Sequence, residues 1–258
     1  MELQGIAAIV TGGASGLGAA TARELAKRGA KVLVADLADD KGKAVAEEIG
    51  GVFAHVDVTS TDDITAAVEQ AKTLGPLRAL VNCAGIGWAQ RTVGRGGVET
   101  AHDLGAFKKV VEINLVGTFD FIRIAATAMR DTEPLNEDGE RGAIVNTASV
   151  AAFDGQIGQA SYSASKGGIV GMTLPVARDL GAVGVRVNTI APGLIDTPIY
   201  GEGEASEQFK ETLKRDLLFP KRLGSADEFA SLAAEALSNS YLNGETIRLD
   251  GAARLRAK

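Results

Sequence analysis

Three residues in the second half of the chain have side chains suited to proton transfer: Ser149, Tyr162 and Lys166. Tyr162 and Lys166 are four residues apart in Tyr-Ser-Ala-Ser-Lys, a spacing that places both side chains on one face of a helix. An ammonium beside a phenol favours the phenolate and lowers a pKa that is about 10 in the free side chain. We therefore expect a tyrosine that exchanges a proton near neutral pH. Exposed helices often carry such pairs, so the interpretation depends on the rest of the chain.

A glycine-rich turn near the N-terminus provides that context. Residues 6–11 have the length and composition of a buried strand, the turn reads Gly-Gly-Ala-Ser-Gly-Leu-Gly, and residues 19–28 have helical composition. Glycines let a backbone approach a pyrophosphate closely, and a helix N-terminus offers free N–H groups and a positive dipole end. The arrangement predicts a phosphate cradle formed by Gly12, Ser15, Gly16, Leu17 and Gly18. The alternative is a glycine-rich turn without a ligand in an ordinary α/β protein.

The next predicted strand, residues 31–36, ends in Asp36. This acidic residue follows the glycine turn at close to the spacing that binds a ribose 2′-hydroxyl. A carboxylate at that position repels the additional phosphate of NADP, and residues 37–40, Leu-Ala-Asp-Asp, supply no cation to offset it. We therefore expect NAD as the cofactor.

The glycines read Thr11-Gly-x-x-x-Gly-x-Gly, which differs from the common G-x-G-x-x-G fingerprint and resembles the short-chain dehydrogenase/reductase family. The resemblance covers nearly the whole chain. Its catalytic four match Asn114, Ser149, Tyr162 and Lys166. Beyond the cradle and Asp36, it implies cofactor contacts from Asp57, Val58, Asn82, Cys83, Ala84, Gly85, Tyr162, Lys166, Pro192, Gly193, Ile195 and Thr197. Cys83 departs from the family's Asn-Asn-Ala-Gly element, where a second Asn stands.

The chemistry implied is hydride transfer between a nicotinamide ring and a secondary alcohol or ketone. Tyr162 would exchange the hydroxyl proton, and Lys166 would lower the pKa of Tyr162 and hold the nicotinamide ribose. Ser149, at the end of an apolar run over residues 142–149, would hydrogen-bond the substrate oxygen where charge develops. In similar enzymes the residue matching Asn114 steadies a water that links the lysine to solvent. The alternative for Asn114 is a structural hydrogen bond between helices, since a buried amide needs partners.

The substrate is predicted from the resemblance. Within the family, residues 146–153, 155–159, 162–175, 191–194 and 242–245 are most similar to NAD-dependent enzymes that oxidise 3-hydroxyacyl-CoA thioesters, tolerate steroids and form homotetramers. Ser149, Gln156 and Tyr162 are the expected substrate contacts. A lid at about residues 194–222 would supply an apolar wall from Ile195, Ile199, Tyr200, Phe209, Leu213, Leu217 and Phe219. Cations near this lid could meet CoA phosphates or form an exposed helix face: Lys210, Lys214, Arg215, Lys221 and Arg222.

Three other functions stay open. An NADPH-dependent 3-oxoacyl-acyl-carrier-protein reductase is disfavoured by Asp36. A steroid or simple secondary-alcohol dehydrogenase would use the same catalytic residues. A dinucleotide-sensing scaffold would have no need of Ser149, Tyr162 and Lys166 together.

Composition limits the other classes of protein. The 258 residues are 45% hydrophobic and 23% charged, which is ordinary for a globular protein, and no uncharged apolar stretch approaches the roughly 18 residues that span a membrane. The first predicted strand starts almost at once, which leaves no room for a signal peptide. One cysteine fits a reducing compartment, so we expect a cytoplasmic protein. The net charge of −6 argues against nucleic acid as a partner, and two isolated histidines predict no metal site.

The element pattern predicts one α/β domain over residues 1–258. Strands are expected at residues 6–11, 31–36, 51–57, 77–82, 142–149, 185–190 and 245–249. Helices are expected at residues 19–28, 39–49, 61–74, 103–130, 161–180 and 207–217, and another after the capping box Ser225-Ala-Asp-Glu228. Strands that alternate with helices form a parallel sheet covered on both faces, so we expect a Rossmann-like, doubly wound sheet of about seven strands.

Overall fold

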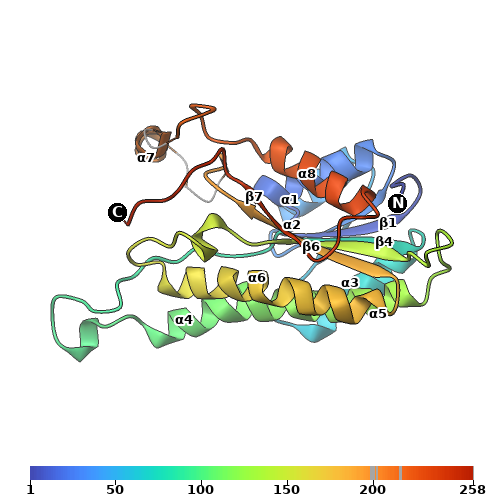
Figure 1. The fold of residues 1–258 in the computed structure, drawn as a ribbon, viewed down its shortest axis with the longest axis horizontal. Coiled ribbons are helices and arrows are strands. Elements are labelled where there is room, and N and C mark those ends of the chain that lie inside the picture. Colours follow the sequence, from blue (N-terminus) through green and yellow to red (C-terminus); the bar gives the residue numbers. More distant parts are fainter. Residues whose placement is uncertain (198–200, 202, 215–216, 258) are drawn as a thin grey trace.

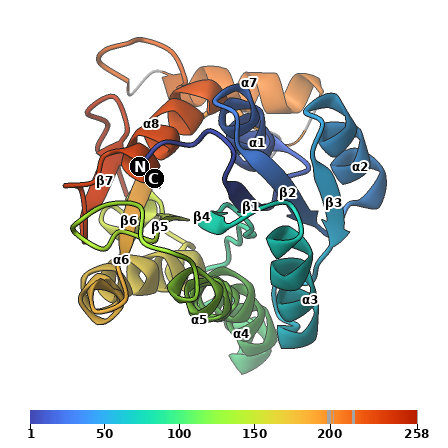
Figure 2. The ribbon, with the colours of Figure 1, turned by 90° about the vertical axis from the view of Figure 1, so that its right-hand side faces the viewer.

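The computed structural model describes residues 1–197, 201, 203–214 and 217–257. Within these residues seven strands form one parallel sheet in the order β3-β2-β1-β4-β5-β6-β7 (Figures 1 and 2). The strands are β1 (Ala7–Thr11), β2 (Lys31–Asp36), β3 (Val52–His55), β4 (Leu77–Asn82), β5 (Gly142–Thr147), β6 (Val185–Pro192) and β7 (Thr246–Leu249). This is the predicted doubly wound fold.

Helices cover both faces of the sheet, as Figure 2 shows. On one face lie α1 (Gly16–Lys27), α2 (Asp39–Glu48) and α8 (Ala226–Ser238). On the other lie α3 (Thr61–Lys72), α4 (Leu104–Val111), α5 (Gly117–Arg130) and α6 (Ala160–Gly181). The short helix α7 (Glu204–Lys214) lies at the edge where the strands end (Figure 1). None of the helices described is long and apolar enough to cross a membrane.

The alternation of side chains along the strands divides the core into two layers. On β1, Val10 packs toward the layer that contains Phe229 of α8, whereas Ile9 packs toward the layer that contains Phe121 of α5. Both phenylalanines are completely buried. Because a parallel sheet covered on both faces has no polar face, its strands are continuous apolar runs, which made them recognisable in the sequence.

The observed elements differ from the predicted ones in several places. The strand β5 ends at Thr147, and Ser149 instead caps the 3-10 helix η3 (Val150–Ala152). The helix predicted at residues 103–130 is interrupted by one π-helical turn, η2 (Glu112–Val116), between α4 and α5. A 3-10 helix, η1 (Val98–Thr100), lies in the loop after β4. The apolar pattern runs through η2 unchanged, so only the backbone hydrogen bonds reveal the extra residue in that turn.

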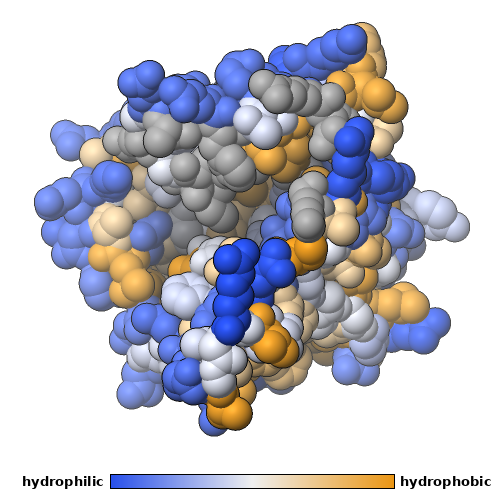
Figure 3. Space-filling model, turned by 90° about the vertical axis from the view of Figure 1, so that its left-hand side faces the viewer, coloured by the Kyte–Doolittle hydropathy of each residue, from blue (hydrophilic) through white to orange (hydrophobic). Residues whose placement is uncertain are grey.

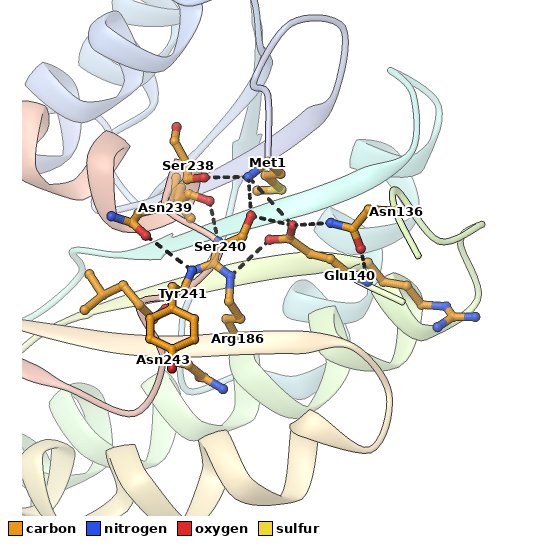
Figure 4. A network of polar contacts seen from close by, with 12 residues as sticks. Met1, Asn136, Glu140, Arg186, Ser238, Asn239, Ser240, Tyr241 and Asn243 are labelled. Atoms are coloured by element: carbon orange, nitrogen blue, oxygen red, sulfur yellow. Dashed lines mark hydrogen bonds and ion pairs between the residues drawn. The ribbon is translucent and has the colours of Figure 1, made fainter. Parts of the chain in front are cut away.

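A buried polar network ties the opposite edge of the sheet together (Figure 4). At the start of β6, Arg186 donates from Nε to Glu140 Oε1 at 3.0 Å and from its other nitrogens to three carbonyl oxygens at and just beyond the end of α8. Ser240 and Asn136 donate to the second oxygen of Glu140. Burial alone would raise the pKa of Glu140, but the hydrogen bonds from Ser240 and Arg186 outweigh it and hold this pKa below its usual range. The network fixes the loop at residues 131–141 against α8, far from the glycine turn.

The strands β1 and β4 lie side by side and are parallel, and the strand order changes direction between them: β2 and β3 follow on one side of β1, and β5, β6 and β7 follow on the other side of β4. In an open parallel sheet a ligand crevice forms at the carboxyl ends of the strands at such a switch point. The glycine turn follows β1, and the segment Cys83–Gly85 follows β4. The topology therefore brings both to the same edge.

Candidate active site

Two connected cavities open along the carboxyl edge of the sheet. One, of about 440 Å³, lies over the glycine turn and Asp36; the other, of about 550 Å³, contains Ser149, Tyr162 and Lys166. Both are lined by Leu17, Cys83, Gly85, Ile86 and Thr197. The molecule is hollowed on this face, which Figure 3 shows. A ligand that extends from one cavity to the other would therefore span from Asp36 to Tyr162.

The glycine turn forms the floor of the first cavity. Gly12 has φ +63°, and a Cβ there would lie 2.8 Å from the backbone nitrogen of Ala84. A Cβ on Gly18 would lie 2.6 Å from the carbonyl carbon of Gly12, so only glycine allows α1 to start this close to the turn. The N-cap Ser15 makes no side-chain hydrogen bond to the first turn of α1. The N–H groups of that turn are therefore free to bind an anion.

Asp36 holds the turn in place. Its Oδ2 accepts from the backbone N–H of Ala14 at 3.0 Å, and its Oδ1 accepts from that of Ala38 at 2.9 Å. Asp57 and Val58 line the same cavity. The Asp57 carboxylate accepts from the N–H and the hydroxyl of Thr59, and these bonds lower the pKa of Asp57. The residues predicted for the adenosine half of a dinucleotide thus line one cavity.

Residues after β4 form the wall between the cavities. Thr11 Oγ1 accepts from the N–H groups of Cys83 and Ala84, both at 3.1 Å. Burial raises the pKa of the Cys83 thiol to about 11, so this side chain is neutral near pH 7. Asn82, which was expected among the cofactor contacts, lies below the wall instead: its Nδ2 donates to Asn146 Oδ1 on β5 at 2.9 Å, and it lines neither cavity.

Ser149 and Tyr162 meet in the second cavity. Ser149 Oγ accepts from the backbone N–H of Ala151 at 3.1 Å, so its own hydroxyl hydrogen can be donated to a further partner. Tyr162 lies in the first turn of α6. Burial raises the pKa of Tyr162, and a hydrogen bond with Ser149 partly opposes the rise. The two hydroxyl groups are placed to bind one substrate oxygen together.

The electrostatics of Lys166 differ from the expectation. Its buried ammonium donates to the carbonyl oxygen of Thr147 at 2.8 Å, and its Nζ lies 5.9 Å from the centroid of the Tyr162 ring. Burial lowers the pKa of Lys166 to about 8. The expectation that Lys166 lowers the pKa of Tyr162 is wrong for this structure, because desolvation of the phenol dominates and the ammonium faces Thr147.

Asn114 is completely buried in the π-helical turn and holds the wall of the site. Its Oδ1 accepts from the N–H of Ile86 at 2.8 Å, and its Nδ2 donates to the carbonyl oxygen of Ile86 and to Ser165 Oγ. Ser165 in turn donates to the carbonyl oxygen of Tyr162. The side chain of Asn114 therefore joins the segment after β4 to α6, the structural alternative considered for it, and π turns are frequent at functional sites.

The segment after β6 completes the second cavity. Pro192, Gly193, Ile195 and Thr197 line it, as does Gln156. Two residues of the predicted apolar wall, Ile195 and Leu213, line the cavity, and Leu217 is buried in a cluster against which Leu213 packs. Phe219 does not line the cavity, and its side chain is 83% exposed. Ile199, Tyr200 and the side chain of Phe209 lie outside the described residues.

The cations near this segment are mostly paired. Lys210 contacts Asp196 and Glu207, Lys214 contacts Glu211, and Arg222 contacts Glu228. Lys221 is exposed, and Arg215 lies outside the described residues. This favours an ion-paired helix face over a phosphate site.

Sequence reasoning missed several contributors to the second cavity, among them two residues that act through their backbone groups and two side chains that line it. Thr147 provides the carbonyl oxygen that binds Lys166, and Ile86 provides the backbone groups that bind Asn114. Trp88 and Leu255 line the cavity. Backbone contacts leave no signal in side-chain patterns, and Leu255 belongs to a C-terminal segment distant in sequence. No group of three residues able to hold a metal occurs in the described part of the chain.

Comparison with known proteins identifies the class. The sequence matches the short chain dehydrogenase family over residues 6–208. The chain belongs to this family of oxidoreductases, which act on CH–OH groups and imply a nicotinamide dinucleotide cofactor. The free helix N-terminus, the tightly packed glycines and Asp36 fit such a cofactor.

Several similar proteins share one name. The chain is 53% identical over 250 residues to 3-hydroxyacyl-CoA dehydrogenase type-2 of Drosophila melanogaster, covering 96% of each. It is 49% identical over 258 residues to the Homo sapiens protein of the same name, covering 99% of this chain and 97% of the relative. The crystal structure of 3-hydroxyacyl-CoA dehydrogenase type-2 from Mycobacterium avium matches with a TM-score of 0.93 and 47% identity over 100% of both chains.

Proposed function

We propose that this chain is an NAD-dependent dehydrogenase that interconverts 3-hydroxyacyl-CoA and 3-oxoacyl-CoA. The observation that carries the reaction class is the placement of Ser149, Tyr162 and Lys166 at one end of a cleft whose other end is Asp36. The substrate is supported by relatives of 49% and 53% identity that are named for it.

In oxidation, Tyr162 takes the proton of the substrate hydroxyl while the carbon loses a hydride. A bound nicotinamide cofactor would supply the acceptor for that hydride. Ser149 donates its hydroxyl hydrogen to the substrate oxygen and orients the alcohol against Tyr162. In reduction, the neutral Tyr162 donates its proton to the oxygen of the ketone. The raised pKa of Tyr162 suits this second direction, because it keeps the phenol protonated near neutral pH.

Lys166 is the positioning cation of the site. Its bond to the Thr147 carbonyl fixes the ammonium beside the cleft, and its pKa of about 8 leaves it charged at pH 7. From there it is placed to bind a ribose hydroxyl. Asn114 acts through Ile86 and Ser165, by holding the cleft wall against α6.

Asp36 supports NAD over NADP. Its carboxylate lines the first cavity, and both of its oxygens accept backbone N–H groups, which fixes its position. Residues 37–40 contain no cation that would attract a 2′-phosphate. This argues against the NADPH-dependent acyl-carrier-protein reductase.

Two arginines on the loop after β4 favour the CoA thioester. Arg91 and Arg95 are exposed, and neither forms an ion pair with any described residue. Arg91 borders a hollow beside Gln156 and Gly158, next to the catalytic cavity. These cations, rather than the paired ones of α7, are available to bind the phosphates of CoA.

The proposal includes a cytoplasmic homotetramer. Large apolar side chains are exposed on α4, η2 and α5, among them Leu104 at 63%, Val116 at 44% and Phe119 at 46%. Burial of such a surface against a second copy is the ordinary role of exposed apolar side chains that lie close together on neighbouring helices. Sedimentation velocity measures the assembly directly.

The substrate test compares 3-hydroxybutyryl-CoA, its N-acetylcysteamine thioester, the free hydroxy acid and a steroid alcohol, each with NAD. We expect the CoA thioester to have the highest kcat/KM. Replacement of both Arg91 and Arg95 with alanine should raise KM for the CoA thioester and leave that for the N-acetylcysteamine thioester unchanged. The CoA assignment fails if the free acid or the steroid is oxidised as efficiently as the CoA thioester.

A further inference from the structure

The C-terminal segment, residues 250–257, borders the catalytic cavity through Leu255 and contacts residues on two sides of it. It follows β7 and ends at the edge where the strands end (Figure 1). On one side, Gln156 Nε2 donates to the carbonyl oxygen of Arg256 at 3.0 Å, and the N–H of Ile157 donates to that of Ala257 at 3.0 Å. These bonds join residues about a hundred positions apart, between the segment after Ser149 and the end of the chain.

An arginine on β7 fixes the same contact. Arg248 donates to both carboxylate oxygens of Asp154, at 3.3 Å and 2.6 Å, and also to Asp250 and to the carbonyl oxygen of Ala253. Arg248 and Asp154 have side chains only 21% and 17% exposed, so water screens this pair weakly. The guanidinium lowers the pKa of Asp154, and the backbone N–H of Leu255 adds to the effect. The segment is therefore bound at its start, middle and end.

On the other side the segment packs against the residues that follow β6. Ala253 is buried in a cluster with Leu217 and Leu223, against which Leu194 and Leu213 pack. Leu194, Leu213 and Leu255 all line the catalytic cavity. These leucines form an apolar part of the cavity lining, whereas Arg91 borders the adjoining hollow beside Gln156.

We propose that residues 250–257 form the end wall of the acyl pocket and that Leu255 limits the length of acyl chain the enzyme accepts. The inference rests on the proposed function. If the CoA phosphates bind near the free arginines, the apolar acyl chain extends toward the leucines and meets Leu255. A hydrophobic pocket discriminates between chains by the space it leaves for each methylene. The hydrogen bonds of Gln156 and Ile157 and the Arg248–Asp154 pair keep this wall fixed.

The test measures kcat/KM with NAD for 3-hydroxyacyl-CoA thioesters of four, eight and twelve carbons. Leu255→Ala should raise the ratio of twelve-carbon to four-carbon efficiency about tenfold, mainly through KM, and Leu255→Phe should lower it. Leu135→Ala is the matched control, because Leu135 is an exposed leucine in the loop at residues 131–141 on the opposite edge. NADH affinity checks that each variant is folded.

A second variant tests the anchoring. Asp154→Asn weakens the pair with Arg248, so amide hydrogen exchange at residues 253–257 should become faster, and the twelve-carbon to four-carbon ratio should rise with the four-carbon kcat unchanged. If the chain-length ratios of the Leu255 variants equal those of the wild type, the inference is wrong and the proposed function stands. If the wild type oxidises none of the thioesters, the proposed function fails, and the inference fails with it.

Discussion

Gly18→Ala tests whether the glycine turn is built to hold a dinucleotide. The added Cβ would lie 2.6 Å from the carbonyl carbon of Gly12 and 3.0 Å from the Cα of Gly13. Carbon atoms in contact are about 3.5 Å apart, so the turn and the start of α1 must separate by about 1 Å. Both neighbours are backbone atoms and cannot rotate away. Such overpacking costs about 1–3 kcal/mol.

This penalty is divided between folding and binding. If the turn of the variant keeps its geometry, the strain remains in the folded protein and lowers the free energy of unfolding. If the turn relaxes outward, it must be compressed again when a pyrophosphate binds, and the affinity for the cofactor falls. The sum of the two losses should be about 1–3 kcal/mol, and a loss of 1.4 kcal/mol in binding weakens NADH affinity about tenfold. Urea denaturation measures the first quantity and calorimetric titration with NADH the second.

Gly181→Ala is the matched control, because a Cβ at Gly181 on α6 meets no atom within 4 Å. Its NADH affinity should equal that of the wild type, and its free energy of unfolding should equal that of the wild type or exceed it by up to about 1 kcal/mol, because a helix favours alanine over glycine. If Gly18→Ala likewise retains both, the turn tolerates a side chain, and the reasoning about the cradle is refuted.

Three further predictions concern the cofactor, the proton and the core. Asp36→Asn should reduce the preference for NAD over NADP about a hundredfold in kcat/KM, near 2.7 kcal/mol, because the charge that repels a 2′-phosphate is lost; an unchanged preference would refute the role of Asp36. Because burial raises the pKa of Tyr162, the phenol stays mostly protonated and the phenolate needed for oxidation becomes more abundant as the pH rises. We therefore expect kcat/KM for oxidation to rise between about pH 6 and 9, whereas kcat/KM for ketone reduction should not rise. A kcat/KM for oxidation that does not depend on pH would contradict this. Phe229→Ala should lower the free energy of unfolding by about 3–5 kcal/mol. The exposed Phe219→Ala should leave it nearly unchanged, and equal losses would show that burial does not decide the cost.

The fold and most of the site could be predicted because their signals are local. Apolar runs, glycine turns and the capping box at Ser225 mark the elements, and Ser225 Oγ indeed accepts from the N–H of Glu228. The positions of Ser149 and Tyr162 at one edge follow from the topology of a parallel sheet. These features depend on residues next to one another in the chain.

The remaining features depend on contacts between distant residues. The apolar run over residues 142–149 has no signal for the end of β5, because that end is set by where the pairing with β6 stops, at Thr147. The spacing of Tyr162 and Lys166 gives their proximity but not their desolvation, so the expected direction of the Tyr162 pKa was wrong. The C-terminal segment meets Gln156 only in the folded chain.

The proposed proton transfer is tested most directly with Tyr162→Phe. NAD-dependent oxidation of 3-hydroxybutyryl-CoA is measured for the wild type and the variant, and NADH affinity is measured for both. The wild type should oxidise the thioester, and the variant should lose turnover by about a hundredfold or more with NADH affinity kept, since only the phenolic oxygen is removed. A variant that binds NADH normally and retains wild-type turnover would contradict the assignment of Tyr162 as the acid and base.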